Sequence, residues 1–209
     1  NRCDSVITDG AAPSKRGRPA AARAEAAAQS ARIRLSLNEN PFGPSPQTIA
    51  ALRDQFGVLC RYGRELGDGL TQAIASREAV STDQIVVGEI LKPLGSHLAQ
   101  TGLRGEEYIY SEPGYTALVD AVRPGGGIVV AVPLNQNLEN DLEGIAARVN
   151  QRTRAIYLVN PHNPSGTVTD AAAFLAFVRE ISKRAVVIID EAYLEFDPDF
   201  EQRTAASLV

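Results

Sequence analysis

Short apolar runs rich in valine and isoleucine alternate with amphipathic segments over most of the chain after residue 70. Strands that are apolar on both faces are typical of a parallel sheet covered by helices on both sides. The pattern predicts strands at residues 85–87, 108–110, 128–132, 155–159 and 186–189. It predicts helices at residues 46–56, 70–80, 90–101, 115–122, 141–149 and 171–182. The predicted fold class is therefore α/β, a mostly parallel sheet with helices on both faces in three α/β/α layers.

The first 69 residues lack this alternation. Residues 1–31 are rich in Ala, Arg, Pro, Ser and Gly, a composition that predicts a disordered tail. The proline-rich stretch that follows predicts an extended arm leading into a helix, with Ser45 as its N-cap and Pro46 at its first position. Three glycines predict a loop at residues 61–69. We expect a tail at 1–31, an arm and loop at 32–69, and an α/β domain at 70–209.

The composition excludes several classes of protein. Residues 1–34 carry seven Lys/Arg against three Asp/Glu, but the remainder carries 14 against 22, so no basic surface for nucleic acid is expected. No apolar run reaches the ~18 residues of a membrane-spanning helix. Cys3 and Cys60 have no metal-ligand spacing, so we expect reduced thiols and no metal site. We expect a cytoplasmic protein; export to the periplasm would require an N-terminal signal that was trimmed away.

The chain contains no methionine, so we expect a processed product or a piece of a longer protein.

Four short motifs each follow a predicted strand. They are Gly88-Glu89, Ser111-Glu112-Pro113-Gly114-Tyr115, Asn160-Pro161-His162-Asn163-Pro164-Ser165-Gly166-Thr167 and Asp190-Glu191-Ala192-Tyr193. Right-handed crossovers place all the loops that follow parallel strands at one edge of the sheet. Ligands of open α/β sheets bind at that edge. The four motifs therefore predict a single binding site.

Asp190 follows an apolar strand, where a carboxylate is costly unless it is paired. One interpretation is a helix N-cap or a structural ion pair. The other is a carboxylate bonded to a protonated pyridine nitrogen, which makes the ring an electron sink. Tyr193, three residues later, could then reach the hydroxyl oxygen of the same ring.

Other residues of the motifs suit the same planar ring. Two prolines and a glycine make residues 160–167 a rigid turn that holds the Asn163 amide as a donor, although an Asx turn that merely ends the strand is the alternative. Tyr115 could lie flat against the ring or pack as a core aromatic. Gly88-Glu89 opens a predicted helix, where a phosphate can sit. Tyr62, in the predicted loop, could donate to a phosphate or pack on the surface.

Three segments match the sequence patterns of one protein family, in the order in which they occur along the chain. They are the arm Leu37-Asn38-Glu39-Asn40-Pro41-Phe42-Gly43-Pro44-Ser45, the turn at 160–167 and the segment at 190–193. The chain resembles the N-terminal half of a fold-type I pyridoxal-phosphate aminotransferase of class I/II, closest to the histidinol-phosphate aminotransferase group. The resemblance covers residues 33–209, and residues 70–209 would be the front part of the large domain that binds the cofactor.

The resemblance implies pyridoxal 5′-phosphate as the cofactor and assigns its ring contacts. Asp190 would pair with the pyridine nitrogen. Asn163 and Tyr193 would bond the ring hydroxyl oxygen, and Tyr115 would stack on the ring.

It also implies contacts around the phosphate and the substrate. Gly88-Glu89 would lie at the phosphate turn, which is shortened relative to the family pattern. Tyr62 would reach the cofactor phosphate of a neighbouring subunit, which implies a homodimer. The arm residues Asn38, Asn40 and Gly43 would fold over the substrate.

The lysine that the family uses to hold the cofactor as a Schiff base has no counterpart in the expected place. The chain has Lys15, Lys92 and Lys183, and the predicted topology places none of them beside Asp190. The resemblance puts that lysine, and a later arginine that binds the substrate carboxylate, beyond Val209. We therefore expect no catalytic residue within the chain and no activity of the chain alone.

The parent protein would then be a pyridoxal-phosphate-dependent transaminase of amino-acid biosynthesis, acting on an amino acid and a 2-oxo acid. Two alternatives stay open. One is a decarboxylase or lyase of amino-acid phosphates with the same fold. The other is a non-catalytic domain that keeps the cofactor pocket without the lysine.

Overall fold

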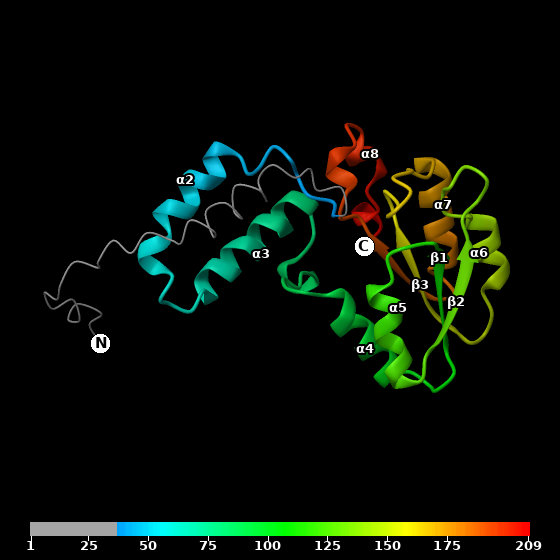
Figure 1. Ribbon diagram of the computed structural model, residues 1–209. Coiled ribbons are helices and arrows are strands. Elements are labelled where there is room, and N and C mark those ends of the chain that lie inside the picture. The colour runs from blue at the N-terminus through cyan, green and yellow to red at the C-terminus, as the bar shows by residue number, and fades with distance from the viewer. Residues whose placement is uncertain (1–36) are drawn as a thin grey trace, which may run out of the picture. The chain divides into compact units, whose positions relative to one another are not determined.

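The computed structural model describes residues 37–209 (Figure 1). The chain divides into two compact units, residues 1–62 and 63–209, and each is described by itself. The predicted tail at 1–31, with Cys3 and Lys15, lies outside the described residues.

The first unit contains the helix α2 (Pro46–Asp54) and the short 3-10 helix η1 (Phe56–Val58). Ser45 caps α2, since its hydroxyl accepts the Thr48 N–H at 3.1 Å, and Pro46 occupies the first turn where no N–H is needed. The predicted N-terminus of this helix is confirmed.

The second unit is built on four parallel strands. They are β1 (Glu107–Glu112), β2 (Ile128–Pro133), β3 (Thr153–Val159) and β4 (Val186–Asp190), in the order β2-β1-β3-β4. The connecting helices are α5 (Ala117–Val122), α6 (Leu142–Arg148) and α7 (Ala171–Ile181), and α4 (Leu91–Thr101) precedes β1. These strands and helices confirm the predicted α/β fold with a parallel sheet.

Helices cover both faces of this sheet, as Figure 1 shows. Ile109, Ile156 and Leu158 are fully buried among residues of α6 and α7, whereas Tyr108 and Tyr157 point to the opposite face and pack with residues of α4 and α5. Side chains alternate between faces along a strand, so apolar residues at successive positions fill two separate cores. The three-layer prediction is confirmed.

Two predictions about the segment before this sheet are wrong. Residues 85–87 form no strand, and Val86 and Val87 are exposed, because the segment has no hydrogen-bonded partner strand among the described residues. The predicted loop at 61–69 is helical from Arg64 onward, in α3 (Arg64–Glu78). Glycine inside a helix costs only about 1 kcal/mol, so Gly67 and Gly69 did not end it.

Short helices make up the rest of the second unit. They are η2 (Thr82–Gln84), η3 (Arg123–Gly125), η4 (Leu194–Phe196), α8 (Phe200–Arg203) and η5 (Ala206–Leu208). None of the helices in residues 37–209 is long and apolar enough to cross a membrane.

Candidate functional site

The strand order creates a switch point between β1 and β3. The chain leaves β1 for β2 on one side of it and returns to β3 on the other side. Loops diverge at such a point, which opens a crevice at the carboxyl ends of the two strands. The predicted motifs at 111–115 and 160–167 follow these two strands, and the motif at 190–193 follows β4 beside them.

Asp190 ends β4 and lies opposite Val159 in the parallel register. Its Oδ2 accepts the hydroxyl of Tyr157 at 2.8 Å, and its Oδ1 accepts the N–H of Ala192 at 3.1 Å. The side chain is half-buried. A carboxylate has about four lone-pair positions, so both oxygens retain room for a further donor. Among the described residues, no cation forms a salt bridge with Asp190. The structure therefore does not support the interpretation of Asp190 as half of a structural ion pair.

The turn after β3 is closed by hydrogen bonds around His162. The His162 N–H donates to the Thr167 carbonyl at 2.8 Å, and the Gly166 N–H donates to the His162 carbonyl at 2.8 Å. The ring is buried, its Nδ1 lies 2.8 Å from Ser165 Oγ, and burial lowers the pKa of His162. The turn is therefore held by a neutral imidazole at its centre.

The loop after β1 packs against this turn through Gly114. A Cβ there would overlap the Ser111 carbonyl oxygen and would lie 3.6 Å from His162 Nε2. The Ser111 carbonyl therefore leaves no room for a side chain at Gly114, and the next residue, Tyr115, leaves 47% of its surface exposed.

A buried asparagine joins the ends of β1 and β3. Asn140 is only 2% exposed; its Oδ1 accepts the Ser111 hydroxyl at 2.7 Å and its Nδ2 donates to the Val159 carbonyl at 3.1 Å. The Thr169 N–H donates to Asn160 Oδ1 at 3.1 Å. These bonds fix the ends of β1 and β3 relative to each other. Asn140 directly precedes the helix predicted at residues 141–149.

The predicted ring contacts occupy one edge of the sheet. Asn163 and Tyr193 are half-buried in the turns after β3 and β4. Burial, the hydrogen bond to Asp190 and the charge of Asp190 raise the pKa of the Tyr157 phenol beneath this edge. This donor set fits a planar ring that carries an N–H: a carboxylate with free lone pairs, an amide, phenols, and an exposed aromatic face.

The other predicted residues do not follow strands of this sheet. Gly88 does not follow a strand, although its φ of +152° favours glycine, and Glu89 is exposed. Their phosphate-binding role stays a prediction. Tyr62 and the arm belong to the first unit. In the arm, Asn40 Oδ1 accepts the Phe42 N–H and Asn40 Nδ2 donates to the Gly43 carbonyl, each at 3.0 Å.

Neither lysine of the described residues forms an ion pair or hydrogen bond with Asp190. Lys92 is exposed near the start of α4. Lys183 precedes β4, at the other end of the strand from Asp190, and its Nζ lies 2.6 Å from Glu180 Oε2.

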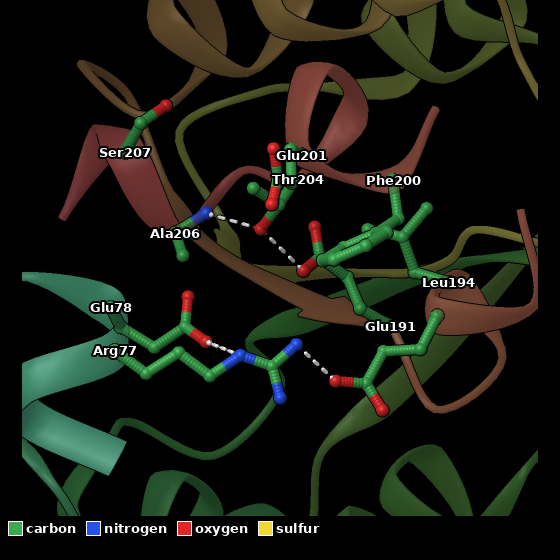
Figure 2. A pocket seen from close by; sticks show the side chains of 10 residues that line it. Arg77, Glu78, Glu191, Leu194, Phe200, Glu201, Thr204, Ala206 and Ser207 are labelled. Carbon is green, nitrogen blue, oxygen red and sulfur yellow. Dashed lines mark hydrogen bonds and ion pairs between the residues drawn. The ribbon is translucent and has the colours of Figure 1, made fainter. Parts of the chain in front are cut away.

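A pocket of about 470 Å³ lies between the end of α3 and the segment after β4. Figure 2 shows Arg77 beside Glu78 and the Thr204 hydroxyl directed at Glu191. The Glu191 carboxylate accepts that hydroxyl at 2.8 Å and the Ala205 N–H at 2.7 Å, so it ties the C-terminal segment to the end of β4. None of the four predicted ring contacts lines this pocket.

The sequence pattern assigned no role to Tyr157, Asn140 or Glu191. Glu191 lies within the 190–193 motif, whereas Tyr157 lies inside a predicted strand and Asn140 directly precedes a predicted helix. Their roles depend on which strands are neighbours, and a single sequence does not show the register.

Known proteins share both the sequence pattern and the fold. The family described as aminotransferase class I and II matches residues 31–207. The histidinol-phosphate aminotransferase of Moorella thermoacetica is 31% identical over 165 residues, covering 78% of this chain and 42% of that protein. The aromatic amino acid aminotransferase of Cutibacterium acnes is 32% identical, covering 80% of this chain and 48% of that protein.

A solved structure also resembles this chain in fold and sequence. The crystal structure of histidinol-phosphate aminotransferase from Sinorhizobium meliloti in complex with pyridoxal-5′-phosphate has a TM-score of 0.68 and 32% identity, covering 77% of this chain and 44% of that chain. The chain spans about half the length of the relatives it matches, between 42% and 53%. The resemblance that the motifs indicated is confirmed over nearly all of the described residues. The chain belongs to the class I and II aminotransferase family.

Proposed function

We propose that the protein to which this chain belongs is a pyridoxal-phosphate-dependent aminotransferase that moves an amino group between an amino acid and a 2-oxo acid. The observation that carries the proposal is Asp190. It is a half-buried carboxylate at the carboxyl edge of the sheet, held by two donors and still able to accept a third. The relatives' names support the same class of reaction.

In this proposal the cofactor supplies the electron sink, and the chain's residues bind and orient it. Asp190 accepts the ring N–H, and Asn163 and Tyr193 donate to the ring hydroxyl oxygen. Tyr115 covers one ring face. Gly88-Glu89 seats the phosphate at the start of the segment that leads into α4.

The remaining assignments concern the substrate and a second subunit. Asn38, Asn40 and Gly43 close over the substrate, and Tyr62 reaches the phosphate held by the partner in a homodimer. The amino donor is histidinol phosphate or an aromatic amino acid, because relatives of both names match this chain at comparable identity. The lysine and the carboxylate-binding arginine lie beyond Val209.

The first experiment sequences the coding region past codon 209. We expect a lysine one strand further on and an arginine after it. The extended protein, assayed with a 2-oxo acid, should transaminate histidinol phosphate or an aromatic amino acid. Release of CO₂ without amino transfer would favour the decarboxylase, and a stop codon directly after codon 209 would favour a non-catalytic binding domain.

The 209-residue chain gives an independent check. With pyridoxal phosphate it should form no lysine adduct with a visible absorption band, because Lys183 precedes β4 at the end opposite Asp190 and Lys92 forms no contact with Asp190. Borohydride reduction followed by peptide mapping tests this. A specific adduct trapped on either lysine would overturn the assignment of the anchor beyond Val209.

A further inference from the structure

Tyr157 lies under the proposed ring site and touches its key carboxylate. The residue is 2% exposed, in β3, on the sheet face covered by α4 and α5. Its hydroxyl donates to Asp190 Oδ2 at 2.8 Å across the β3–β4 pair. Asp190 Oδ1 accepts the Ala192 N–H at 3.1 Å. The carboxylate is thus fixed by one donor on each oxygen.

The Tyr157 hydroxyl stays protonated and acts as a hydrogen-bond donor. Burial, the hydrogen bond to Asp190 and the charge of Asp190 all raise the pKa of Tyr157, in that order of importance. The phenol therefore stays protonated at physiological pH, and its proton points at the carboxylate. A buried hydroxyl that donates to a carboxylate stabilises the charged form of that carboxylate.

We propose that Tyr157 is a positioning residue that holds Asp190 oriented for a ligand bearing a ring N–H. The inference rests on the proposed function, since it deepens the role of the same site. Two donors already occupy the carboxylate, so the third partner that completes it is also a donor. A protonated pyridine nitrogen meets this requirement, and an unprotonated one does not.

Tyr110 offers a matched control in the same core cluster. It is also buried, on the neighbouring strand β1, and its hydroxyl donates to Glu112 Oε1 at 3.0 Å. Replacing either tyrosine by phenylalanine removes one hydroxyl and keeps the ring. Only Tyr157→Phe removes a donor from Asp190.

The test measures binding of pyridoxamine 5′-phosphate, which carries the ring and the phosphate and needs no lysine. The wild-type chain, Tyr157→Phe, Asp190→Asn, the double variant and Tyr110→Phe are titrated by calorimetry. We expect Tyr157→Phe to weaken binding about tenfold, because Asp190 is no longer held in its binding orientation before the ligand arrives. It should have little further effect in the Asp190→Asn background, and Tyr110→Phe should bind like the wild type.

A second readout separates positioning from stability. The absorption spectrum of bound pyridoxamine phosphate reports protonation of the ring nitrogen, and Tyr157→Phe should move loss of that proton to lower pH. The analogue with CH in place of the ring nitrogen should bind wild type and Tyr157→Phe equally. Equal affinity and spectra for wild type and Tyr157→Phe would overturn the role of Tyr157 alone. No binding by the wild-type chain would overturn the proposed function itself, and this role with it.

Discussion

At the scale of single residues, buried polar side chains hold the loops of the site. His162 closes the turn after β3 from within, and Asn140 bridges the ends of β1 and β3. Both are 2% exposed, so a broken hydrogen bond would leave an unpaired group away from water, at a cost of about 1–3 kcal/mol.

His162 should make the stability of the chain depend on pH. Burial lowers its pKa in the folded state below the ~6.5 of the unfolded chain, so the unfolded state binds more protons in that range. The contribution of the neutral ring is complete above about pH 6.5 and is lost as the pH falls through the folded-state pKa. Urea denaturation at several pH values between 5 and 7.5 measures this slope.

His162→Asn should flatten the slope, because asparagine can still bond Ser165 but does not titrate. His97 is the matched control: it is exposed on α4, and His97→Asn should keep the slope of the wild type. A slope that survives in His162→Asn would show that another group is responsible.

At the scale of elements, helix propensity and tertiary packing make opposite demands on glycine. Gly95 lies where α4 crosses α5: a Cβ there would overlap the Leu118 carbonyl oxygen and lie 3.1 Å from Ala121 Cβ. Gly69 lies in α3 with nothing within 4 Å of such a Cβ. The same substitution should therefore act with opposite sign at the two sites.

Gly95→Ala should destabilise the chain by about 1–3 kcal/mol, because the extra methyl forces α4 and α5 apart. Gly69→Ala should stabilise it by up to about 1 kcal/mol, because alanine favours the helix and meets no obstacle. Thermal or urea denaturation compares the pair. Stabilisation by Gly95→Ala would contradict the close packing of α4 on α5.

The strand predictions are confirmed where an apolar run also has a neighbouring strand to pair with. The strands at 108–110, 128–132, 155–159 and 186–189 exist because each has a parallel neighbour. Residues 85–87 have the same composition and form no strand, because strand formation needs hydrogen bonds from another segment. Local apolar character alone does not supply them.

At the scale of the whole molecule, the outer side of β4 is an unpaired apolar edge within residues 37–209. Its sequence is Val-Val-Ile-Ile-Asp, and Val186 is 44% exposed. The opposite edge, β2, ends at Pro133, which lacks an N–H and disfavours a further strand. Edge pairing between chains is therefore expected at β4.

The 209-residue chain should self-associate as its concentration rises, and Val186→Lys should reduce this because a charge at an edge opposes pairing. Ile128→Lys, on β2 and also 45% exposed, is the control and should change association less. Sedimentation velocity over a concentration series measures it. Equal effects of the two variants would show that general surface charge, not the β4 edge, controls association.

The sequence by itself determined the α/β class, the family and the motifs that carry cofactor chemistry, because apolar periodicity and turn-forming residues are local properties. It identified Asp190, Asn163 and Tyr115 as residues suited to one ring. Only the tertiary structure decided that Gly88 follows no strand, that Glu191 ties down the C-terminal segment, and that Tyr157 donates to Asp190. Those facts depend on which strands are neighbours and in what register, and contacts between residues far apart in the chain set both.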